Sequence, residues 1–591
     1  MRKILKNLQT KDIFVLLFCV GLIVFQVWLD MELPKYMQKI TTLLKTPGTE
    51  VVEIWKNGGF MLLCSLGSMA SAILVGFFVS RLAAGFSMRL RANVFSCVES
   101  FSLEQIKRFS TASLITRTTN DVTQLQMVIA MGMQVLIKAP IIAIWAICEI
   151  SSANWQCSIA TGVAVAIMLT TISIAVGLAL PKFKKMQTLT DNINNVTREN
   201  LEGSRVVRAF NAEGFEKQKF EKANDELTKT GLFTSRVMSI MSPMMGFVMS
   251  SLSLAIYWIG AIVISNMSNA IIPEKITAFG EIMTFSSYAM QVVMSFMMIT
   301  MIFVILPRAT VSARRIAEVL NTKPTILSGN FDGETETSGE VEFKNVSFKY
   351  PDAEENILED ISFVAKKGET VAFIGSTGSG KSTLINLVPR FYDVTAGQVL
   401  IDGVDIKEYN LKTLRNKIGY ISQKAVMFSG TVTENLTFGQ NGKGEPTDEE
   451  LNEALSIACA SNFVGKMEHK KESYIAQGGA NISGGQKQRL SIARAIARKP
   501  EILIFDDSFS ALDYKTDKKL RSNLDKKLND TTRLIVAQRI GTIKDADKII
   551  VLNDGKMVGI GTHKELLSTC EVYKEIALSQ FSKEEIENEL K

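Results

Sequence analysis

The sequence predicts a membrane-embedded bundle of six transmembrane helices, followed by a soluble α/β domain built around a phosphate-binding loop (P-loop). Three observations predict this fold class. The long apolar runs and all five tryptophans lie in the first half of the 591-residue chain. The second half contains GSTGSGKS, Gly375–Ser382, between a short apolar strand and a helical segment. It also contains ILIFDDSFSALD, Ile502–Asp513, in which a buried strand ends in two adjacent carboxylates.

The chain is too long for one hydrophobic core, so several domains are expected. We assign residues 1–320 to the membrane domain, with its six spans and two long connections. Residues 321–338 are rich in Gly, Ser, Thr and Pro, which is typical of a linker. The nucleotide-binding domain is predicted at 339–580, and residues 581–591 form a charged C-terminal tail.

Apolar runs of about 20 residues are long enough to cross a bilayer as helices. The connections at 85–131 and 182–236 are long, helical in pattern and rich in Lys and Arg, which favours a cytoplasmic position. An even number of spans then places both termini and the soluble domain in the cytoplasm. A cleaved signal peptide is the alternative for the basic N-terminus, but no small-residue cleavage site follows it. The predicted spans are roughly 13–33, 59–84, 132–152, 155–181, 240–265 and 278–306.

Composition excludes several classes of function. The net charge of +6 is mild and is explained by basic residues near the membrane, so nucleic acid is not an expected partner. The seven cysteines show no paired spacing, which indicates buried thiols in a reducing compartment and not a disulfide framework. With only two histidines, His469 and His563, a histidine-based zinc site is not expected.

Two features of the spans are candidates for contact with a transported compound. Methionines recur at helical spacing in the fifth and sixth spans, and flexible thioethers suit varied apolar partners. Helix packing or lipid contact explains them equally well. The ionisable residues Lys138 and Glu281 lie nearest the spans, where such residues are functional candidates; a position at the span ends is the alternative interpretation of both. The methionines are Met238, Met241, Met244, Met245 and Met249, then Met290, Met294, Met297, Met298 and Met301.

The phosphate loop predicts ATP or GTP binding. Its glycines let backbone N–H groups curl around phosphate oxygens, and the helix that follows adds its positive end. We expect Lys381 to reach the β- and γ-phosphates and Ser382 to bind Mg²⁺. The expected nucleotide-binding residues here are Gly375, Ser376, Thr377, Gly378, Ser379, Gly380, Lys381, Ser382 and Thr383.

Three further residues complete the expected site. Asp506, at the end of its strand, is predicted to bind Mg²⁺ directly or through water. Asp507 stands where a general base or water-orienting group is expected. Tyr350 follows a strand and could stack on the nucleotide base, or pack at the sheet edge.

NISGGQKQR, Asn481–Arg489, resembles the signature of ABC transporters, usually written LSGGQ, with Ile482 in place of leucine. Together with the phosphate loop, Asp506, the SALD segment and Gln423 in YISQ, it resembles a complete ABC nucleotide-binding domain. Six spans ahead of that domain resemble a type IV exporter half-transporter. The segment FNAEGFEKQKF, at 210–220, resembles the second cytoplasmic coupling region, and RTTNDV, at 117–122, resembles the end of the first.

The resemblance implies a head-to-tail dimer, in which each ATP lies between one phosphate loop and the signature of the other chain. Gln423 would then touch Mg²⁺ and carry the nucleotide state to the spans. It also implies Mg²⁺ ligands at Ser382, Gln423 and Asp506. The signature residues expected to contact ATP bound on the partner are Ser483, Gly484, Gly485 and Gln486.

Two catalytic positions depart from the family pattern. The family places glutamate where this chain has Asp507, and a switch histidine where it has Gln538, in IVAQR. Aspartate is one methylene too short, and glutamine cannot transfer a proton near neutral pH. Gln477 also stands where relatives often carry glutamate. Neither histidine of the chain is placed to substitute.

Altered catalytic residues beside an intact loop and signature resemble the degenerate subunit of heterodimeric bacterial multidrug exporters. The expectation is an ATP-driven translocase subunit in the bacterial plasma membrane. It would move small amphipathic or hydrophobic compounds outward by alternating access, among membrane lipids, with hydrolysis at the site completed by a partner half-transporter that carries the consensus Glu and His. The alternatives are a homodimeric lipid or peptide exporter, and an ATP-gated sensor or regulatory membrane protein.

Overall fold

The computed structural model divides the chain into two compact units, which we describe separately. The first unit comprises residues 1–99 and 110–322, and the second comprises residues 100–109 and 323–591. Most of the tail predicted at 581–591 lies outside the described residues, as does Met301. The structure describes residues 4, 8–46, 50–151, 155–267, 272–300, 302–333, 335–439, 441–582, 584 and 586.

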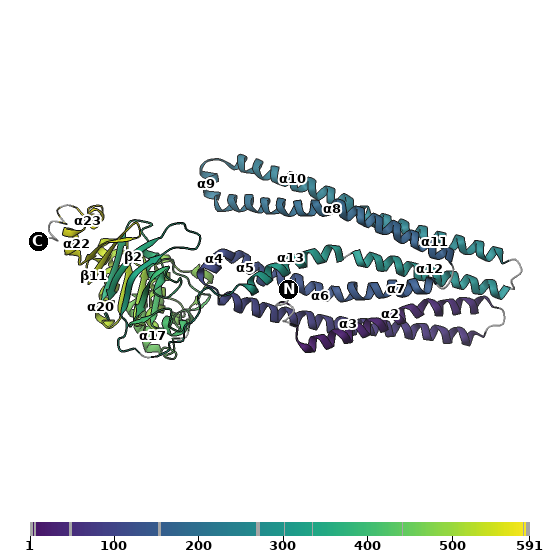
Figure 1. Ribbon diagram of the computed structural model, residues 1–591, viewed down its shortest axis with the longest axis horizontal. Coiled ribbons are helices and arrows are strands. Elements are labelled where there is room, and N and C mark those ends of the chain that lie inside the picture. Colours follow the sequence, from purple (N-terminus) through teal and green to yellow (C-terminus); the bar gives the residue numbers. More distant parts are fainter. Residues whose placement is uncertain are drawn as a thin grey trace. The chain divides into compact units, whose positions relative to one another are not determined.

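The first unit is entirely helical in the part of it that the structure describes (Figure 1). Six of its helical stretches are long and apolar enough to cross a membrane, which confirms the predicted number of spans. The helices are α2 Thr10–Lys45, α3 Val51–Glu99, α5 Thr111–Thr118, α6 Asn120–Gly132, the π-helix η1 Met133–Lys138, α7 Ala139–Ser151, α8 Trp155–Glu202, α9 Ser204–Ala209, α10 Glu213–Ser239, α11 Met241–Asn266, α12 Ile272–Thr300 and α13 Ile302–Asn321.

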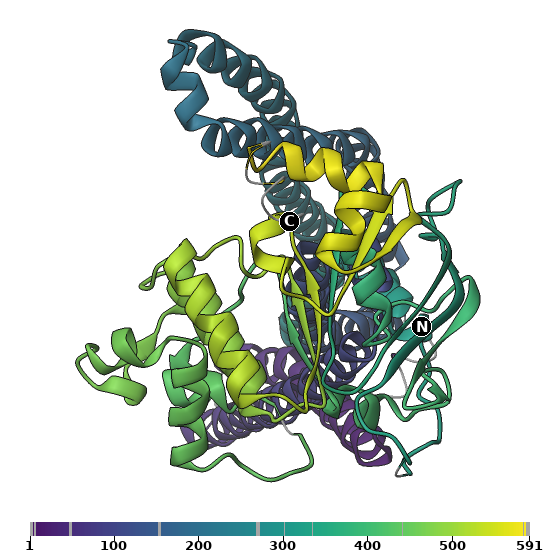
Figure 2. The same ribbon diagram turned by 90° about the vertical axis from the view of Figure 1, so that its left-hand side faces the viewer.

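These helices extend well beyond the apolar runs that revealed them. α3 has 49 residues although its apolar run was predicted as 59–84, and α8 has 48 although the prediction was 155–181. The backbone hydrogen bonds of a helix are internal, so a helix need not end where its apolar run ends, and α8 continues even past Pro181. The charged connections are therefore long extensions of the spans, and α8 and α10 lie side by side, joined through α9 (Figures 1 and 2).

The core of the first unit lies where α2, α8, α11 and α12 meet. Tyr288 of α12 is buried and donates its hydroxyl to the carbonyl of Met31 in α2, at 2.9 Å. Gly260 of α11 allows a close approach to α12, because a Cβ there would lie 2.5 Å from the side chain of Ile282. Of the methionines in α11, Met245 is buried in this core.

The second unit contains a six-stranded sheet in the order β12-β11-β3-β10-β9-β6 and a four-stranded antiparallel sheet in the order β2-β1-β4-β5. In the larger sheet, β11, β3, β10, β9 and β6 are parallel and β12 is antiparallel. The strands are β1 Val341–Phe348, β2 Leu358–Ala365, β3 Thr370–Gly375, β4 Ala396–Ile401, β5 Val404–Asp405, β6 Ile418–Ile421, β9 Ile502–Asp506, β10 Thr532–Val536, β11 Lys548–Asn553 and β12 Lys556–Gly561, with a short pair β7 Gly430–Thr431 and β8 Tyr474–Ile475.

Helices pack against the six-stranded sheet, as expected of an α/β domain. The segment Ser100–Phe109, which belongs by sequence to the first long connection between spans, groups with this unit. The helices are α4 Leu103–Phe109, α14 Lys381–Leu387, α15 Leu411–Asn416, α16 Val432–Leu436, α17 Asp448–Ile457, α18 Ser461–Gly465, α19 Gly484–Ala497, α20 Tyr514–Lys527, α21 Ile540–Ile543, α22 His563–Thr569 and α23 Glu571–Leu578, with 3₁₀ turns at Lys470–Glu472 and Gln477–Gly479.

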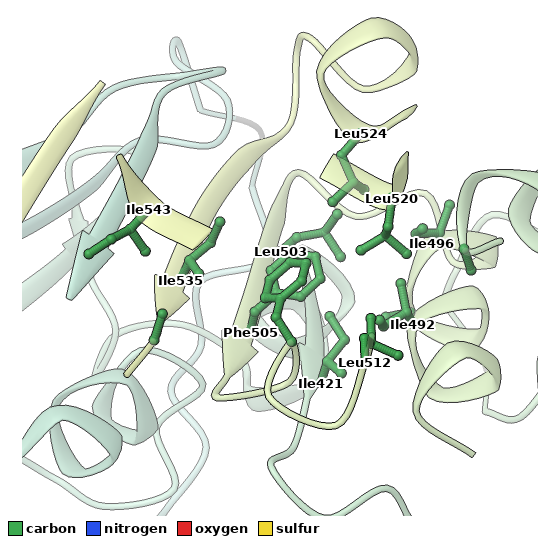
Figure 3. Packing of buried hydrophobic residues seen from close by; sticks show 14 of the residues in the cluster. Ile421, Ile492, Ile496, Leu503, Phe505, Leu512, Leu520, Leu524, Ile535 and Ile543 are labelled. Carbon is green, nitrogen blue, oxygen red and sulfur yellow. The ribbon is translucent and has the colours of Figure 1, made fainter. Parts of the chain in front are cut away.

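Strand β9 shows how the core positions the two carboxylates. All five of its residues are buried. Successive side chains of a strand point to opposite faces, so Leu503 and Phe505 join the cluster formed with α19 and α20 (Figure 3). Ile502 and Ile504 join the cluster on the other face. Burial on both faces fixes the register of the strand, and therefore the point at which the acidic pair leaves the sheet.

Candidate functional site

The phosphate loop connects β3 to α14, as its sequence predicted. Gly378 and Gly380 have φ values of 89° and 93°, in a region that residues with a side chain rarely adopt. A Cβ at Gly380 would also lie 2.7 Å from the side chain of Leu358. The glycines are therefore required by the backbone path of the loop, and that path is the one that curls N–H groups toward a bound phosphate.

Lys381 lies along this loop. Its ammonium donates to the carbonyls of Gly375, at 2.9 Å, and Ser376, at 2.6 Å, and to the Ser379 hydroxyl at 3.2 Å. Burial lowers the pKa of Lys381, and the nearby Asp507 carboxylate acts in the opposite direction. A partly desolvated ammonium gains most when a phosphate oxygen becomes its partner, so the lysine is placed to bind a polyphosphate.

The structure brings together Ser382 and Asp506, which are 124 residues apart in sequence. The Ser382 hydroxyl donates to Asp506 Oδ1 at 2.7 Å. Tyr420, at the end of neighbouring β6, donates to Asp506 Oδ2 at 3.3 Å and to the side-chain oxygen of Asn386 at 2.9 Å. Burial, followed by the charge of Asp506, raises the pKa of Tyr420, so the phenol stays protonated and remains a donor.

Ser382 and Asp506 suit a Mg²⁺ ion that is bound together with a nucleotide, and not a metal ion held by protein ligands alone. Mg²⁺ is usually bound by one or two protein oxygens together with phosphates and water. The described residues contain no group of three or more His, Cys, Asp or Glu that could hold a metal ion. Ser382 and Asp506 supply the two oxygens expected of a nucleotide-dependent site. The side-chain nitrogen of Gln423, the third expected ligand, donates to Asp507, and its side-chain oxygen is the atom that would bind Mg²⁺.

Asp507 sits in a different environment from its neighbour. Its Oδ2 accepts hydrogen bonds from the amides of Gln423, at 3.0 Å, and Gln538, at 2.8 Å. Burial raises the pKa of the Asp507 carboxyl; the charge of Asp506 acts in the same direction, whereas hydrogen bonds from Gln423 and Ser510 act against them. Asp507 also has φ = 47°, an uncommon value for a residue with a side chain. The structure therefore joins Asp507 and Gln538 directly.

The signature segment forms a helix start. Ser483 is the N-cap of α19, and Gln486 completes a reciprocal capping box with it, through bonds of 2.8 and 3.4 Å. Gly484 and Gly485 form the first turn of the helix. Among the described residues, the side-chain hydrogen bonds of Ser483 and Gln486 stay within this cap and do not reach the phosphate loop.

Tyr350 lies beside the helix that carries the phosphate loop. Its hydroxyl is 3.1 Å from Thr383 Oγ1, and its ring packs edge-on against Tyr392. The ammonium of Lys107, in α4, lies 5.6 Å from the centre of the Tyr350 ring. A hydrogen bond to Tyr392 raises the pKa of Lys107. The aromatic ring predicted to stack on the base thus lies close to the segment Ser100–Phe109, through Lys107.

Sequence reasoning missed Tyr420 and Asn386. A signal existed for Tyr420, because parallel strands end at the same edge of a sheet and Tyr420 is a polar residue near the end of β6. His563 is buried and its Nδ1 is 2.6 Å from the Tyr573 hydroxyl, away from the expected catalytic position. Gln477 lies in a 3₁₀ turn ahead of the signature.

The fold and the site define a membrane protein with six candidate spans joined to a nucleotide-binding domain. Residues 16–296 match the ABC transporter transmembrane region, and residues 358–510 match the ABC transporter family. The chain is 40% identical over 529 residues to an uncharacterised ABC transporter ATP-binding protein of Mycobacterium tuberculosis, covering 88% of this chain and 87% of that protein. The chain therefore belongs to the ABC transporter family.

Other relatives agree with this assignment. An uncharacterised ABC transporter ATP-binding protein of Bacillus subtilis is 34% identical over 532 residues, covering 90% of both chains. The ATP-dependent lipid A-core flippase of Aromatoleum aromaticum is 30% identical over 525 residues, covering 86% of this chain and 83% of that protein. The structure of a bacterial Atm1-family ABC exporter with ATP bound matches with a TM-score of 0.79 and 22% identity, covering 96% of this chain and 99% of that one.

These findings confirm the predicted fold class and the half-transporter architecture, in which one chain carries one transmembrane region and one ATP-binding domain. The protein is a multi-pass membrane protein of the ABC exporter fold, and its ABC domain binds ATP and couples ATP hydrolysis to transport. Exporters of this family work as dimers.

Proposed function

We propose that this chain is one subunit of a heterodimeric ATP-driven exporter of amphipathic or hydrophobic compounds, and that its own ATP site binds nucleotide but hydrolyses it slowly. The observation that carries the proposal is the pair of amide bonds at Asp507. Gln423 and Gln538 both donate to Asp507 Oδ2, at 3.0 and 2.8 Å. One of the two carboxylate oxygens that could orient the attacking water therefore already accepts from two donors.

The chemistry of these side chains supports slow hydrolysis. A water molecule must be held in line with the γ-phosphate and must lose a proton as it attacks. Gln538 can neither accept nor deliver that proton, because its amide does not titrate near neutral pH. A carboxylate one methylene too short misplaces the water, and a misplacement of about 1 Å costs roughly 10²-fold in rate.

The phosphate loop and the signature segment, which both keep the family pattern, support a role in a dimer. In the proposed arrangement, Lys381 binds the phosphates of ATP, while Ser382 and Asp506 hold Mg²⁺. Gln423 joins that metal site during the transport cycle and transmits the nucleotide state to the spans. The capped start of α19 meets the γ-phosphate of the ATP bound on the partner, through Ser483, Gly484, Gly485 and Gln486. The partner is a second half-transporter with the consensus Glu and His.

The membrane arrangement is proposed from the distribution of charge and helix. The protein lies in the bacterial plasma membrane among lipids, with the nucleotide-binding domain and both termini in the cytoplasm. The proposed membrane domain covers residues 1–320 and the linker 321–338. The nucleotide-binding domain covers 339–580 and the tail 581–591. ATP binding closes the nucleotide domains and opens the spans outward. Hydrolysis at the competent site resets them. Nucleic acid has no part in this cycle.

A second candidate is a homodimeric exporter of lipid. The ATP-dependent lipid A-core flippases, of which the one from Aromatoleum aromaticum is 30% identical, support it. The two candidates differ in composition: a homodimer has two identical ATP sites, both with Asp507 and Gln538, whereas the heterodimer has one altered site and one consensus site.

Purification of the tagged chain from its native host tests the proposal. We expect a distinct half-transporter to co-elute in equal amount, and we expect the chain expressed alone to hydrolyse ATP slowly, with no further loss in Asp507→Ala. As a control, Asp506→Ala should weaken Mg²⁺-dependent ATP binding. Rapid hydrolysis by the chain alone that Asp507→Ala abolishes would contradict an impaired site, and recovery of the chain only as a homodimer would favour the second candidate.

A further inference from the structure

Helices α2, α3, α7 and α12 of the first unit line an open cavity of about 570 Å³. This volume is within the range of sites for drug-sized molecules. Apolar side chains predominate in the lining, with hydroxyl and amide groups from one side of α12. Thioether side chains, which adapt to apolar groups of varied shape, come from three of the four helices, α2, α3 and α12. The methionines that line the cavity are Met37, Met61, Met283, Met294 and Met298.

Asp30 is the one charged residue in that lining. Its Oδ2 lies 3.3 Å from the ammonium of Lys138, and its Oδ1 accepts a hydrogen bond of 2.5 Å from Ser68. Pro34, one turn further along α2, has no N–H and therefore removes the helical donor for the Asp30 carbonyl. The position thus presents oxygen acceptors beside an apolar space.

Lys138 approaches Asp30 from a π-helix, η1, at the end of which it lies. π-helical turns widen a helix locally and are frequent at functional sites. Lys138 contacts the Asp30 carboxylate but does not line the cavity, so its ammonium lies on the side of Asp30 away from the cavity. It is an internal counter-ion, and a second cation can reach Asp30 from the cavity side.

The neighbouring charges leave a negative surplus. Lys35 lies 3.1 Å from both Glu32 and Glu149, which bridges α2 to α7. With Asp30 and Lys138, the described group contains three carboxylates and two ammonium groups, a net charge of −1. An anion entering the cavity would meet Asp30 as its nearest charge. The cavity therefore favours a ligand with one positive charge.

We propose that the cavity binds an amphipathic organic monocation, whose apolar body packs among the methionines and whose charge shares Asp30 with Lys138. The inference rests on the proposed function, because it names the substrate class of that exporter. Asp30 is then the residue that selects the charge of the substrate. Lys138 competes with the substrate cation for the same carboxylate and therefore lowers the affinity of the cavity for that cation.

Tetraphenylphosphonium and tetraphenylborate test this inference, because they have nearly the same size and shape and opposite charge. Their binding to the full-length chain is measured at pH 7.5 in nanodiscs of zwitterionic lipid, with empty nanodiscs as the blank. We expect tetraphenylphosphonium to bind about tenfold or more tightly than tetraphenylborate, since one charge-assisted contact is typically worth that much. Asp30→Asn should remove the preference.

Two further variants keep the test decisive if Asp30→Asn folds poorly. Lys138→Gln should strengthen tetraphenylphosphonium binding several-fold, and misfolding cannot produce a gain. Glu281→Gln removes a carboxylate from α12 outside the cavity lining and should leave the preference unchanged. Equal binding of the two ions, tighter binding of tetraphenylborate, or weaker binding in Lys138→Gln would overturn the inference. The measurement uses no ATP, so its outcome is independent of hydrolysis at Asp507 and of the identity of the partner.

Discussion

Asp506 and Asp507 leave the same buried strand one residue apart, yet they face different partners. Asp506 accepts from two hydroxyl groups, those of Ser382 and Tyr420, on the side of the phosphate loop. Asp507 accepts from two amides, those of Gln423 and Gln538, on the side of the switch segment. One carboxylate adjoins groups that suit a metal and phosphates, and the other adjoins groups that cannot move a proton.

The two carboxylates separate nucleotide binding from nucleotide hydrolysis. The side of Asp506 includes the phosphate loop, whose glycines have the backbone conformation that its motif requires. On the side of Asp507, the two side chains that contact the carboxylate are amides, which do not titrate near neutral pH. Changes on the first side should therefore alter binding, and changes on the second should alter turnover alone.

Removing the ammonium of the phosphate loop should have the largest effect. Lys381→Ala eliminates the cation that would contact the phosphates, and two charge-assisted hydrogen bonds are together worth about a hundredfold in affinity. We expect ATP binding to the purified chain, measured with a fluorescent ATP analogue, to weaken by roughly that factor. Lys367→Ala, at an exposed position in the same domain, is the matched control and should bind normally. If Lys381→Ala binds ATP as tightly as the native chain, the side of Asp506 is not the nucleotide-binding side and the contrast with Asp507 fails.

Restoring the family's catalytic pair should have the next largest effect. Asp507→Glu with Gln538→His returns a carboxylate of full length and a titrating side chain, and we expect hydrolysis at this site to rise roughly tenfold to a hundredfold. The measurement is steady-state ATP hydrolysis by the complex, with the catalytic glutamate of the partner replaced by glutamine so that only this site contributes. ATP affinity should not change.

The single variants sharpen the same test. Either one alone should recover little, because the two groups act on one water molecule and their effects are not additive. If the double variant hydrolyses no faster than the native chain, the two substitutions are not the cause of slow hydrolysis.

The sequence predicted the side of Asp506 better than the side of Asp507. A phosphate loop is a local motif, so Lys381 and Ser382 could be placed from spacing alone, and a strand end is enough to place Asp506. The convergence of Gln423 and Gln538 on one oxygen depends on three loops that follow β6, β9 and β10. Such a meeting is set by the order of strands in the sheet, which no single segment encodes.

The membrane unit shows the same limit. The apolar runs predicted six spans, because bilayer thickness imposes a length on each. The helix ends were missed by many residues, since nothing apolar marks where a helix in water stops. Lys138 was singled out from the sequence, but its partner Asp30 was not. The two are 108 positions apart and meet only when α2 packs beside η1.

The smallest predicted effect concerns the charge of Asp507 itself. Burial raises the pKa of its carboxyl above the ordinary value of 3.8, so the folded chain holds the proton more tightly than the unfolded chain does. Stability is therefore lost as pH rises through the raised pKa, and no such loss occurs in acid, where both states are protonated. Asp507→Asn keeps an oxygen that can accept from the two glutamines and removes the charge.

We expect the thermal midpoint of Asp507→Asn to exceed that of the native chain by a few degrees at pH 8, with the difference shrinking toward pH 4.5. All five tryptophans lie in the membrane half, so calorimetry of the nucleotide-free full-length chain is the suitable measurement. Asp352→Asn, at an exposed position, is the control and should change the midpoint little. A midpoint that falls in Asp507→Asn at pH 8 would mean that the two amide bonds stabilise the charged carboxylate more than burial opposes it. The corner around Asp507 would then be built to keep that charge, as a catalytic carboxylate requires, and the contrast with Asp506 would be one of geometry alone.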